Sequence, residues 1–183
     1  MTTAPPSDFH AELTKLLPNL RAFARSLTRS GDQADDLVQE AVMKAWRNWE
    51  QFAPDSNLKA WMFTILRNAY LSERRKRKNE VQDVEGEFAA QLGTKAEQPG
   101  HMDMIDFQAA FAQLLPEHKE ALILIGAEGF SYEEAALMCG CAVGTMKSRV
   151  NRARNKLVQI MGLESAAEIG AGEKTDAFLR AVG

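Results

Sequence analysis

The segment from Met146 to Met161 carries the side chains best suited to act on another molecule, because they bind phosphates and base edges. It contains five Lys or Arg residues and no Asp or Glu. On a helical wheel, one face is apolar and consists of Met146, Val150, Ala153 and Leu157. The opposite face and its margins carry the polar side chains Lys147, Ser148, Arg149, Asn151, Arg152 and Asn155. A helix with this division is suited to a DNA major groove.

A second helix and a tight turn are predicted directly before this segment. Ser131 is suited to the N-cap position, and Glu134 follows at the spacing of a capping box. Gly140 supplies the turn. By itself, a basic helix is as readily an ordinary surface helix with a solvated face. The capped partner helix and the glycine turn favour a helix-turn-helix that reads duplex DNA.

A second basic segment lies earlier in the chain, where residues 67–78 hold six cations and one acid. The predicted helix over residues 58–79 also carries the aromatic side chains Trp61, Phe63 and Tyr70. Cations bind phosphates, and aromatic rings can stack on unpaired bases. For the aromatic residues, packing in a core is the simpler interpretation. For the basic run we predict contact with nucleic acid, because the chain already contains a separate DNA-reading element.

Charge is unevenly distributed along the chain, although the net charge of −3 gives no overall nucleic-acid signal. Residues 80–106 hold seven acids and one cation, lack helical periodicity and contain Gly and Pro. We predict a flexible acidic linker over residues 81–104. Two basic segments on either side of it indicate two contacts with nucleic acid.

The rest of the chain follows amphipathic helical patterns, and no strand pattern or internal repeat is visible. Before the helix-turn-helix, apolar spacing predicts helices over residues 10–29, 32–49, 58–79, 106–115 and 116–126. Asp32 is expected to cap the second of these helices, and Pro116 suits the first turn of the last. The sequence therefore predicts an all-α protein with two small helical domains.

Several classes of function find no support in the sequence. No apolar run is long enough to span a bilayer, and the first residues lack the basic flank and apolar block of a signal peptide, so we expect a cytoplasmic protein without membrane contact. The two cysteines, Cys139 and Cys141, fit a reducing compartment. The histidines His10, His101 and His118 lack the spacing of metal ligands. With no phosphate loop or nucleophile motif, we expect no enzyme, no cofactor and no metal site.

Together these segments resemble a bacterial sigma factor of the extracytoplasmic-function (ECF) group, and in particular the EcfG-type general stress sigma factors of alphaproteobacteria. The resemblance rests on LKAWMFTILRNAYLSERRKRKNEV and GFSYEEAALMCGCAVGTMKSRVNRARNKL. In that group two helical domains, region two and region four, are joined by a linker. Here region two would be residues 10–80, the linker residues 81–104 and region four residues 105–162. Residues 163–183 form a tail without an assigned role.

The resemblance implies that the chain binds core RNA polymerase and directs it to a subset of promoters. The polymerase would be bound through Asp35, Asp36, Gln39 and Glu40. The −10 element, with one base flipped from the opening duplex, would be bound by Asp55, Ser56, Asn57, Arg67, Asn68, Arg74, Arg75 and Arg77. The −35 element would be bound by Lys147, Ser148, Arg149, Asn151 and Arg152.

The resemblance also implies a soluble anti-sigma factor of the NepR type, which a PhyR-like response regulator titrates by sigma mimicry. One alternative is a sigma-like decoy that binds an anti-sigma factor without initiating transcription, although this chain has no room for the receiver domain that such mimics carry. Another is a conventional helix-turn-helix regulator. That interpretation accounts for the C-terminal helices and leaves the aromatic and basic helix unexplained.

Overall fold

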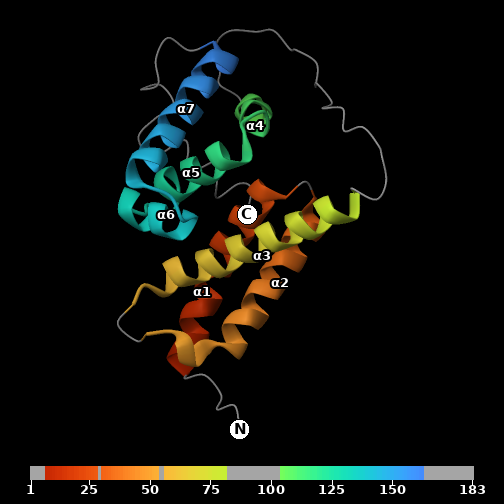
Figure 1. The fold of residues 1–183 in the computed structure, drawn as a ribbon, viewed down its shortest axis with the longest axis vertical. Coiled ribbons are helices and arrows are strands. Elements are labelled where there is room, and N and C mark those ends of the chain that lie inside the picture. The colour runs from red at the N-terminus through yellow and green to blue at the C-terminus, as the bar shows by residue number, and fades with distance from the viewer. Residues whose placement is uncertain (1–6, 29, 54–55, 82–103, 163–183) are drawn as a thin grey trace.

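The computed structural model describes residues 7–28, 30–53, 56–81 and 104–162. Within these ranges the chain forms seven α-helices and one 3₁₀ turn and contains no strand, which confirms the predicted all-α class (Figure 1). Asp55, linker residues 82–103 and tail residues 163–183 lie outside the described residues.

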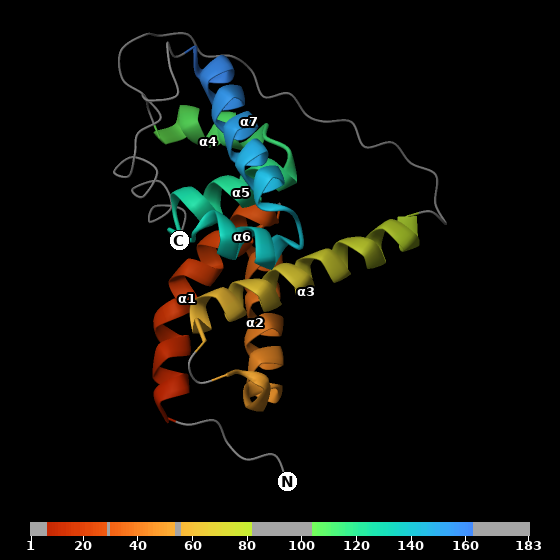
Figure 2. The same cartoon turned by 60° about the vertical axis from the view of Figure 1, so that its left-hand side comes forward.

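The N-terminal unit consists of three long helices packed against one another: α1 (Ser7–Leu27), α2 (Gly31–Arg47) and α3 (Leu58–Val81). Their apolar faces meet in a core whose fully buried side chains are Leu20, Phe23, Leu37, Met62, Phe63 and Leu66. The rings of Phe23 and Phe63 are stacked with centroids 5.0 Å apart, which ties α1 to α3. Beyond this core the C-terminal part of α3 projects past the other helices (Figure 2).

Two predicted details of the N-terminal helices were wrong. The cap of α2 is Ser30 and not Asp32, because Ser30 has an extended backbone and its hydroxyl accepts a hydrogen bond from the Gln33 amide at 3.2 Å. Asp32 instead lies in the first turn, where its charge suits the positive end of the helix. Helix α2 ends at Arg47 and not at Trp49, and a 3₁₀ turn, Trp49–Gln51, follows it.

The C-terminal unit consists of α4 (Met104–Ala112), α5 (Pro116–Gly126), α6 (Tyr132–Cys139) and α7 (Val143–Met161). Pro116 occupies the first turn of α5, as predicted, because its missing amide proton is not needed there. Helix α4 lies two to three residues earlier than expected. Helix α7 buries the whole predicted stripe of Met146, Val150, Ala153 and Leu157, and its opposite face is left to solvent.

The two units pack directly against each other. Helix α1 contacts α5, and α3 contacts α6, so the segments before and after the linker lie side by side (Figures 1 and 2). Buried side chains of both units form one continuous hydrophobic cluster. The sequence predicted two domains but contained no information on this arrangement.

Candidate nucleic-acid interface

The helix-turn-helix is held by a complete capping box and a left-handed glycine. The Ser131 hydroxyl accepts a hydrogen bond from the Glu134 amide at 3.1 Å, and the Glu134 carboxylate accepts one from the Ser131 amide at 2.8 Å. The bond from the Ser131 amide to the carboxylate is the main cause that lowers the pKa of Glu134 from its ordinary value, and the Ser131 side chain adds to it. Gly140 has φ +61°, a conformation that side chains disfavour, and it ends α6 so that α7 can begin three residues later.

The predicted −35 residues lie on the free side of α7. Lys147, Ser148, Asn151 and Arg152 are exposed. Arg149 is half-buried, and its Nη1 lies 4.0 Å from the Cys141 sulfur. These positions present cations and hydrogen-bonding groups on one surface above an apolar back, which is the arrangement needed to reach into a major groove.

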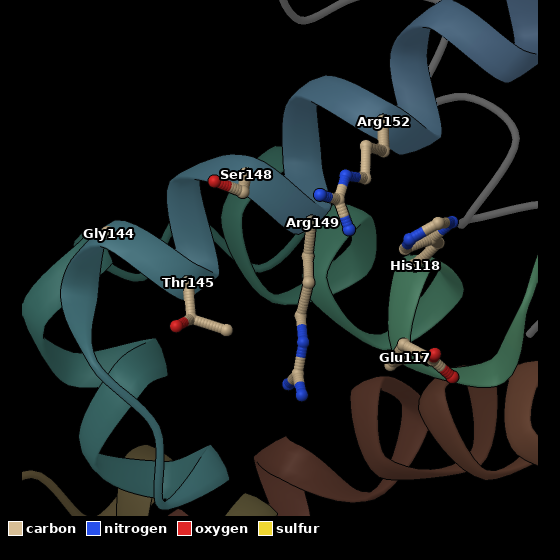
Figure 3. Close-up of a pocket in the computed structure, with 7 residues that line it drawn as sticks. All are labelled: Glu117, His118, Gly144, Thr145, Ser148, Arg149 and Arg152. Carbon is tan, nitrogen blue, oxygen red and sulfur yellow. The ribbon is translucent and has the colours of Figure 1, made fainter.

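Helix α5 contributes to the same surface. An open hollow of about 430 Å³ is lined by Glu117 and His118 of α5 and by Gly144, Thr145, Ser148, Arg149 and Arg152 of α7. In Figure 3 both arginine side chains extend from α7 into the space beside α5. Sequence reasoning missed Glu117 and His118, because they precede the start of α7 by at least 25 residues and carry no local pattern.

The predicted −10 residues divide into exposed and engaged groups. Most of those described are exposed, namely Ser56, Asn57, Asn68, Arg74, Arg75 and Arg77. Two of the exposed arginines have partners on their own helix, since Arg77 pairs with Glu73 and Arg75 donates to the Ser72 hydroxyl at 3.4 Å. Asn57 also has a structural role, because its Oδ1 accepts a hydrogen bond from the Ala60 amide in the first turn of α3.

Arg67 is the one described member of this group that is not exposed, because its side chain packs against the C-terminal unit. Its Nε lies 2.5 Å from Glu120 Oε1 and its Nη2 lies 3.4 Å from Oε2. The two side chains are only 13% and 9% exposed. Burial alone would lower the pKa of Arg67, but the hydrogen bond and charge of Glu120 outweigh it and the pKa is raised. The sequence interpretation did not foresee this pairing.

The aromatic residues of α3 take mostly structural positions. Phe63 is 1% exposed and lies in the core. Trp61 is half-buried, with its ring centroid 5.3 Å from that of Phe52 and 6.3 Å from that of Phe9. Core packing, the simpler interpretation, therefore accounts for Phe63 entirely and for most of the Trp61 surface.

The residues predicted to bind polymerase lie along α2. Asp36, Gln39 and Glu40 are exposed, and Asp35 is half-buried. Two of these carboxylates have neighbours within their own unit, since Asp35 Oδ1 lies 3.3 Å from Arg21 Nε and Glu40 Oε1 lies 2.6 Å from Lys44 Nζ. Asp36 and Gln39 are the members most open to an outside partner.

Comparison with known proteins bears on both units. Residues 13–80 match the family model for sigma-70 region 2, and residues 104–157 match that for sigma-70 region 4. The chain is 48% identical over 168 residues to the ECF RNA polymerase sigma factor EcfG of Rhodopseudomonas palustris, covering 92% of this chain and 93% of the relative. This chain belongs to the ECF sigma factor family. The ECF RNA polymerase sigma factor SigC of Mycobacterium tuberculosis is a more distant relative, 33% identical over 68% of each chain.

Solved structures agree with this membership of the ECF sigma factors. The sigma factor RpoE of Bartonella quintana, solved in complex with the anti-sigma factor NepR, matches with a TM-score of 0.76 at 51% identity, over 87% of this chain and all of that one. The PhyRSL–NepR complex of Sphingomonas sp. Fr1 matches with a TM-score of 0.62 at 21% identity over 85% and 90% of the chains, a likeness of fold alone. Among the described helices, none is long and apolar enough to cross a membrane.

Proposed function

We propose that this ECF sigma factor binds core RNA polymerase in the cytoplasm and directs it to promoters of general stress response genes. The observation that carries the proposal is the pair of DNA-facing surfaces on one chain, the exposed basic front of α7 and the exposed basic end of α3. A conventional helix-turn-helix regulator needs only the first surface. The chain is 48% identical to an EcfG protein over 92% of its length, and this similarity supports general stress response genes as its targets.

We assign the steps to the two units and the segments beside them. Residues 10–80 act as region two and bind polymerase and the −10 element, and residues 105–162 act as region four and bind the −35 element. Residues 81–104 serve as the acidic linker, and the tail over residues 163–183 has no assigned role. Asp35, Asp36, Gln39 and Glu40 of α2 form the contact with polymerase.

Region four reads the −35 duplex with α7. Ser148, Asn151 and Arg152 reach base edges from the centre of the exposed face, and Lys147 and Arg149 bind phosphates from its margins. This division follows from geometry, because central side chains enter the groove deepest. The hollow between α5 and α7 gives a DNA backbone room to approach Arg149 and Arg152.

Region two binds the −10 element as it melts. The residues of this surface are Asp55, Ser56, Asn57, Arg67, Asn68, Arg74, Arg75 and Arg77. Their cations attract the phosphates, and the polar residues of the turn before α3 hold a base that has left the stack. Phe63 is excluded from base stacking because it is buried in the core, and Trp61 leaves only part of its ring open because it packs against Phe52.

A soluble anti-sigma factor is the regulatory partner that the comparisons favour. The Bartonella sigma factor that resembles this chain was solved with NepR. We infer that a NepR-like protein binds this chain and that a PhyR-like regulator competes for it. Co-purification of this chain with a NepR-like protein, reversed by an activated PhyR-like protein, is the expected result.

Run-off transcription with purified core polymerase, this chain and stress-promoter templates tests the proposed function. We expect a discrete transcript that requires the chain. Tight binding to the anti-sigma factor without any transcript would instead identify a sigma-like decoy. Specific duplex binding with neither transcript nor polymerase binding would identify a conventional regulator.

A further inference from the structure

The contact between the two units is built from three glutamates of region four and four polar side chains of region two. The innermost pair is Arg67 and Glu120, described above. The side chain of Glu120 is 9% exposed, so its carboxylate is almost entirely removed from solvent. A charge in this position is tolerated because a guanidinium neutralises it and donates two hydrogen bonds.

Lys59 makes the second contact. Its Nζ lies 2.8 Å from Glu128 Oε2 and donates to the Glu128 carbonyl oxygen at 2.7 Å. The same ammonium lies 5.0 Å from the centroid of the Phe130 ring, within the range of a cation–π interaction. Asn19 of α1 also donates to Glu128, whose side chain is 3% exposed. The sequence interpretation had assigned no role to Lys59.

The third contact involves the start of α3, and an apolar contact lies between the polar pairs. Asn57 Nδ2 donates to Glu134 Oε1 at 3.3 Å. The ring of Phe63 meets that of Phe130 edge-on with centroids 5.4 Å apart. The three glutamates thus form a row beside the first half of α3. Each carboxylate accepts a hydrogen bond from a side chain at the start of α3 or within its first half.

Carboxylates arranged along a row of donors present the same chemistry as the phosphates of a DNA strand. Arg67 and Asn57 belong to the surface proposed above for the −10 element. We propose that region four acts as an internal mimic of the −10 strand, pairing Glu134, Glu128 and Glu120 with Asn57, Lys59 and Arg67, and that this closed chain is inhibited until the regions separate. The inference rests on the proposed function, which supplies the identity of the competing strand.

Opening of this contact leaves no lone charge behind. When the regions part, Arg67 and Glu120 both enter water, so neither is left buried without a partner. The remaining cost is the exposed apolar surface around Phe63 and Phe130. Contacts of this mixed polar and apolar kind between domains resemble transient interfaces, which a larger partner such as polymerase can displace.

Binding of single-stranded DNA to the full chain, without polymerase, tests the inference. The probe is a short fluorescent single strand of random sequence, and the variant is Glu120→Gln with Glu128→Gln. We expect the double variant to bind the strand about tenfold more tightly than the parent. This gain follows if the fraction of molecules in the open, DNA-binding state rises from roughly one tenth to nearly all. The charge-matched control is Glu12→Gln with Glu133→Gln, two exposed carboxylates outside the contact.

Alkylation of Cys139 reports opening independently of DNA. This thiol is buried beside Arg67 and Glu120, and it should react faster in the double variant than in the control. Unchanged DNA affinity relative to the control overturns the inference, whether or not Cys139 reacts faster. If the double variant does not fold, Glu128→Gln alone gives the same comparison, because Glu128 lies in the loop between α5 and α6.

Run-off transcription separates this inference from the proposed function. A promoter-specific transcript from the parent chain, together with equal oligonucleotide affinity in variant and control, leaves the sigma function standing and removes the internal mimic. If the parent, the double variant and the control all fail to bind the single strand while the parent still makes a transcript, the sigma function likewise stands and the internal mimic is removed. Tighter binding and faster alkylation confined to the double variant support the inference.

Discussion

Cys139 and Cys141 are separated by one residue, but their surroundings differ. Cys139 is buried, and this burial together with the nearby Glu120 carboxylate raises the pKa of its thiol to about 12. Cys141 is half-exposed. Because the thiolate is the reactive form, iodoacetamide at pH 8 should modify Cys141 well before Cys139. Peptide mapping by mass spectrometry over time checks this order, and equal rates in the folded chain would contradict it.

Arg152 belongs to the exposed front of α7 and to the hollow beside α5. Its replacement in Arg152→Ala should weaken binding to a −35 duplex by roughly 1–3 kcal/mol if the guanidinium reaches a base edge. Fluorescence anisotropy with specific and scrambled duplexes measures the effect. Lys15→Ala removes one exposed cation from α1 and should leave the affinity nearly unchanged. Equal affinities for the Arg152 variant and the parent would remove this residue from the interface.

Local sequence patterns account for the residues that were predicted correctly. The capping box of Ser131 and Glu134 and the buried stripe of α7 depend on spacings of three or four residues, which the sequence displays directly. The partner of Arg67 is different, because Glu120 lies 53 residues away across the linker. Which of two surfaces a cation faces depends on how the units pack, and no local periodicity carries that information.

At the level of elements, the helices themselves followed from apolar periodicity, and only their ends shifted. The end of a helix depends on which of several neighbouring groups captures the free amides. Ser30 and Asp32 were both suited to cap α2, and the extended backbone at Ser30 decided the outcome. Backbone geometry decides which of two candidates two positions apart becomes the cap. The sequence therefore placed the start of α2 only to within two residues.

The capping box of α6 provides a prediction for a whole element. Ser131→Ala should lower the free energy of unfolding by about 1 kcal/mol, because an amide of the first turn loses its acceptor. The lowered pKa of Glu134 adds a pH dependence. The Glu134 carboxylate contributes fully to the free energy of unfolding above the ordinary glutamate pKa of about 4.3. This contribution is lost as the pH falls through the lowered pKa of Glu134 in the folded chain.

Urea unfolding of the parent and the Ser131 variant at neutral pH and at about pH 3 measures both effects. The difference between the two chains should be larger at neutral pH. Ser30→Ala is the matched control, because it removes the N-cap hydroxyl of α2. That cap is not part of a capping box, so no glutamate carboxylate is bound to it. A difference for the Ser131 variant that is the same at both pH values would show that the Ser131 hydroxyl does not contribute to the lowered pKa of Glu134.

The whole molecule combines the two surfaces proposed to recognise the promoter with a contact that holds the two units together. The front of α7 is open in the closed chain, whereas part of the α3 surface is covered by region four. The −35 and −10 surfaces are therefore not equally available. Duplex binding by region four and strand capture by region two should respond differently to any partner that separates the units.

The outer face of α2 gives a prediction that concerns the polymerase and not the closed state. Asp36 is exposed, and α2 packs chiefly on α1 and α3 within its own unit. Asp36→Arg reverses a charge on the surface proposed to meet polymerase, and we expect its affinity for core polymerase to fall at least about tenfold. The alkylation rate of Cys139 should stay at the parent value, because the contact between the regions is untouched.

Surface plasmon resonance with immobilised core polymerase measures this affinity, with Glu12→Arg on α1 as a charge reversal outside the proposed contact. Equal affinities for the Asp36 variant and the parent would remove α2 from the polymerase interface. A faster reaction of Cys139 in the Asp36 variant would mean that α2 also stabilises the closed chain. Polymerase binding and separation of the two regions would then be coupled through α2. A partner that binds α2 would weaken the contact of Arg67 with Glu120.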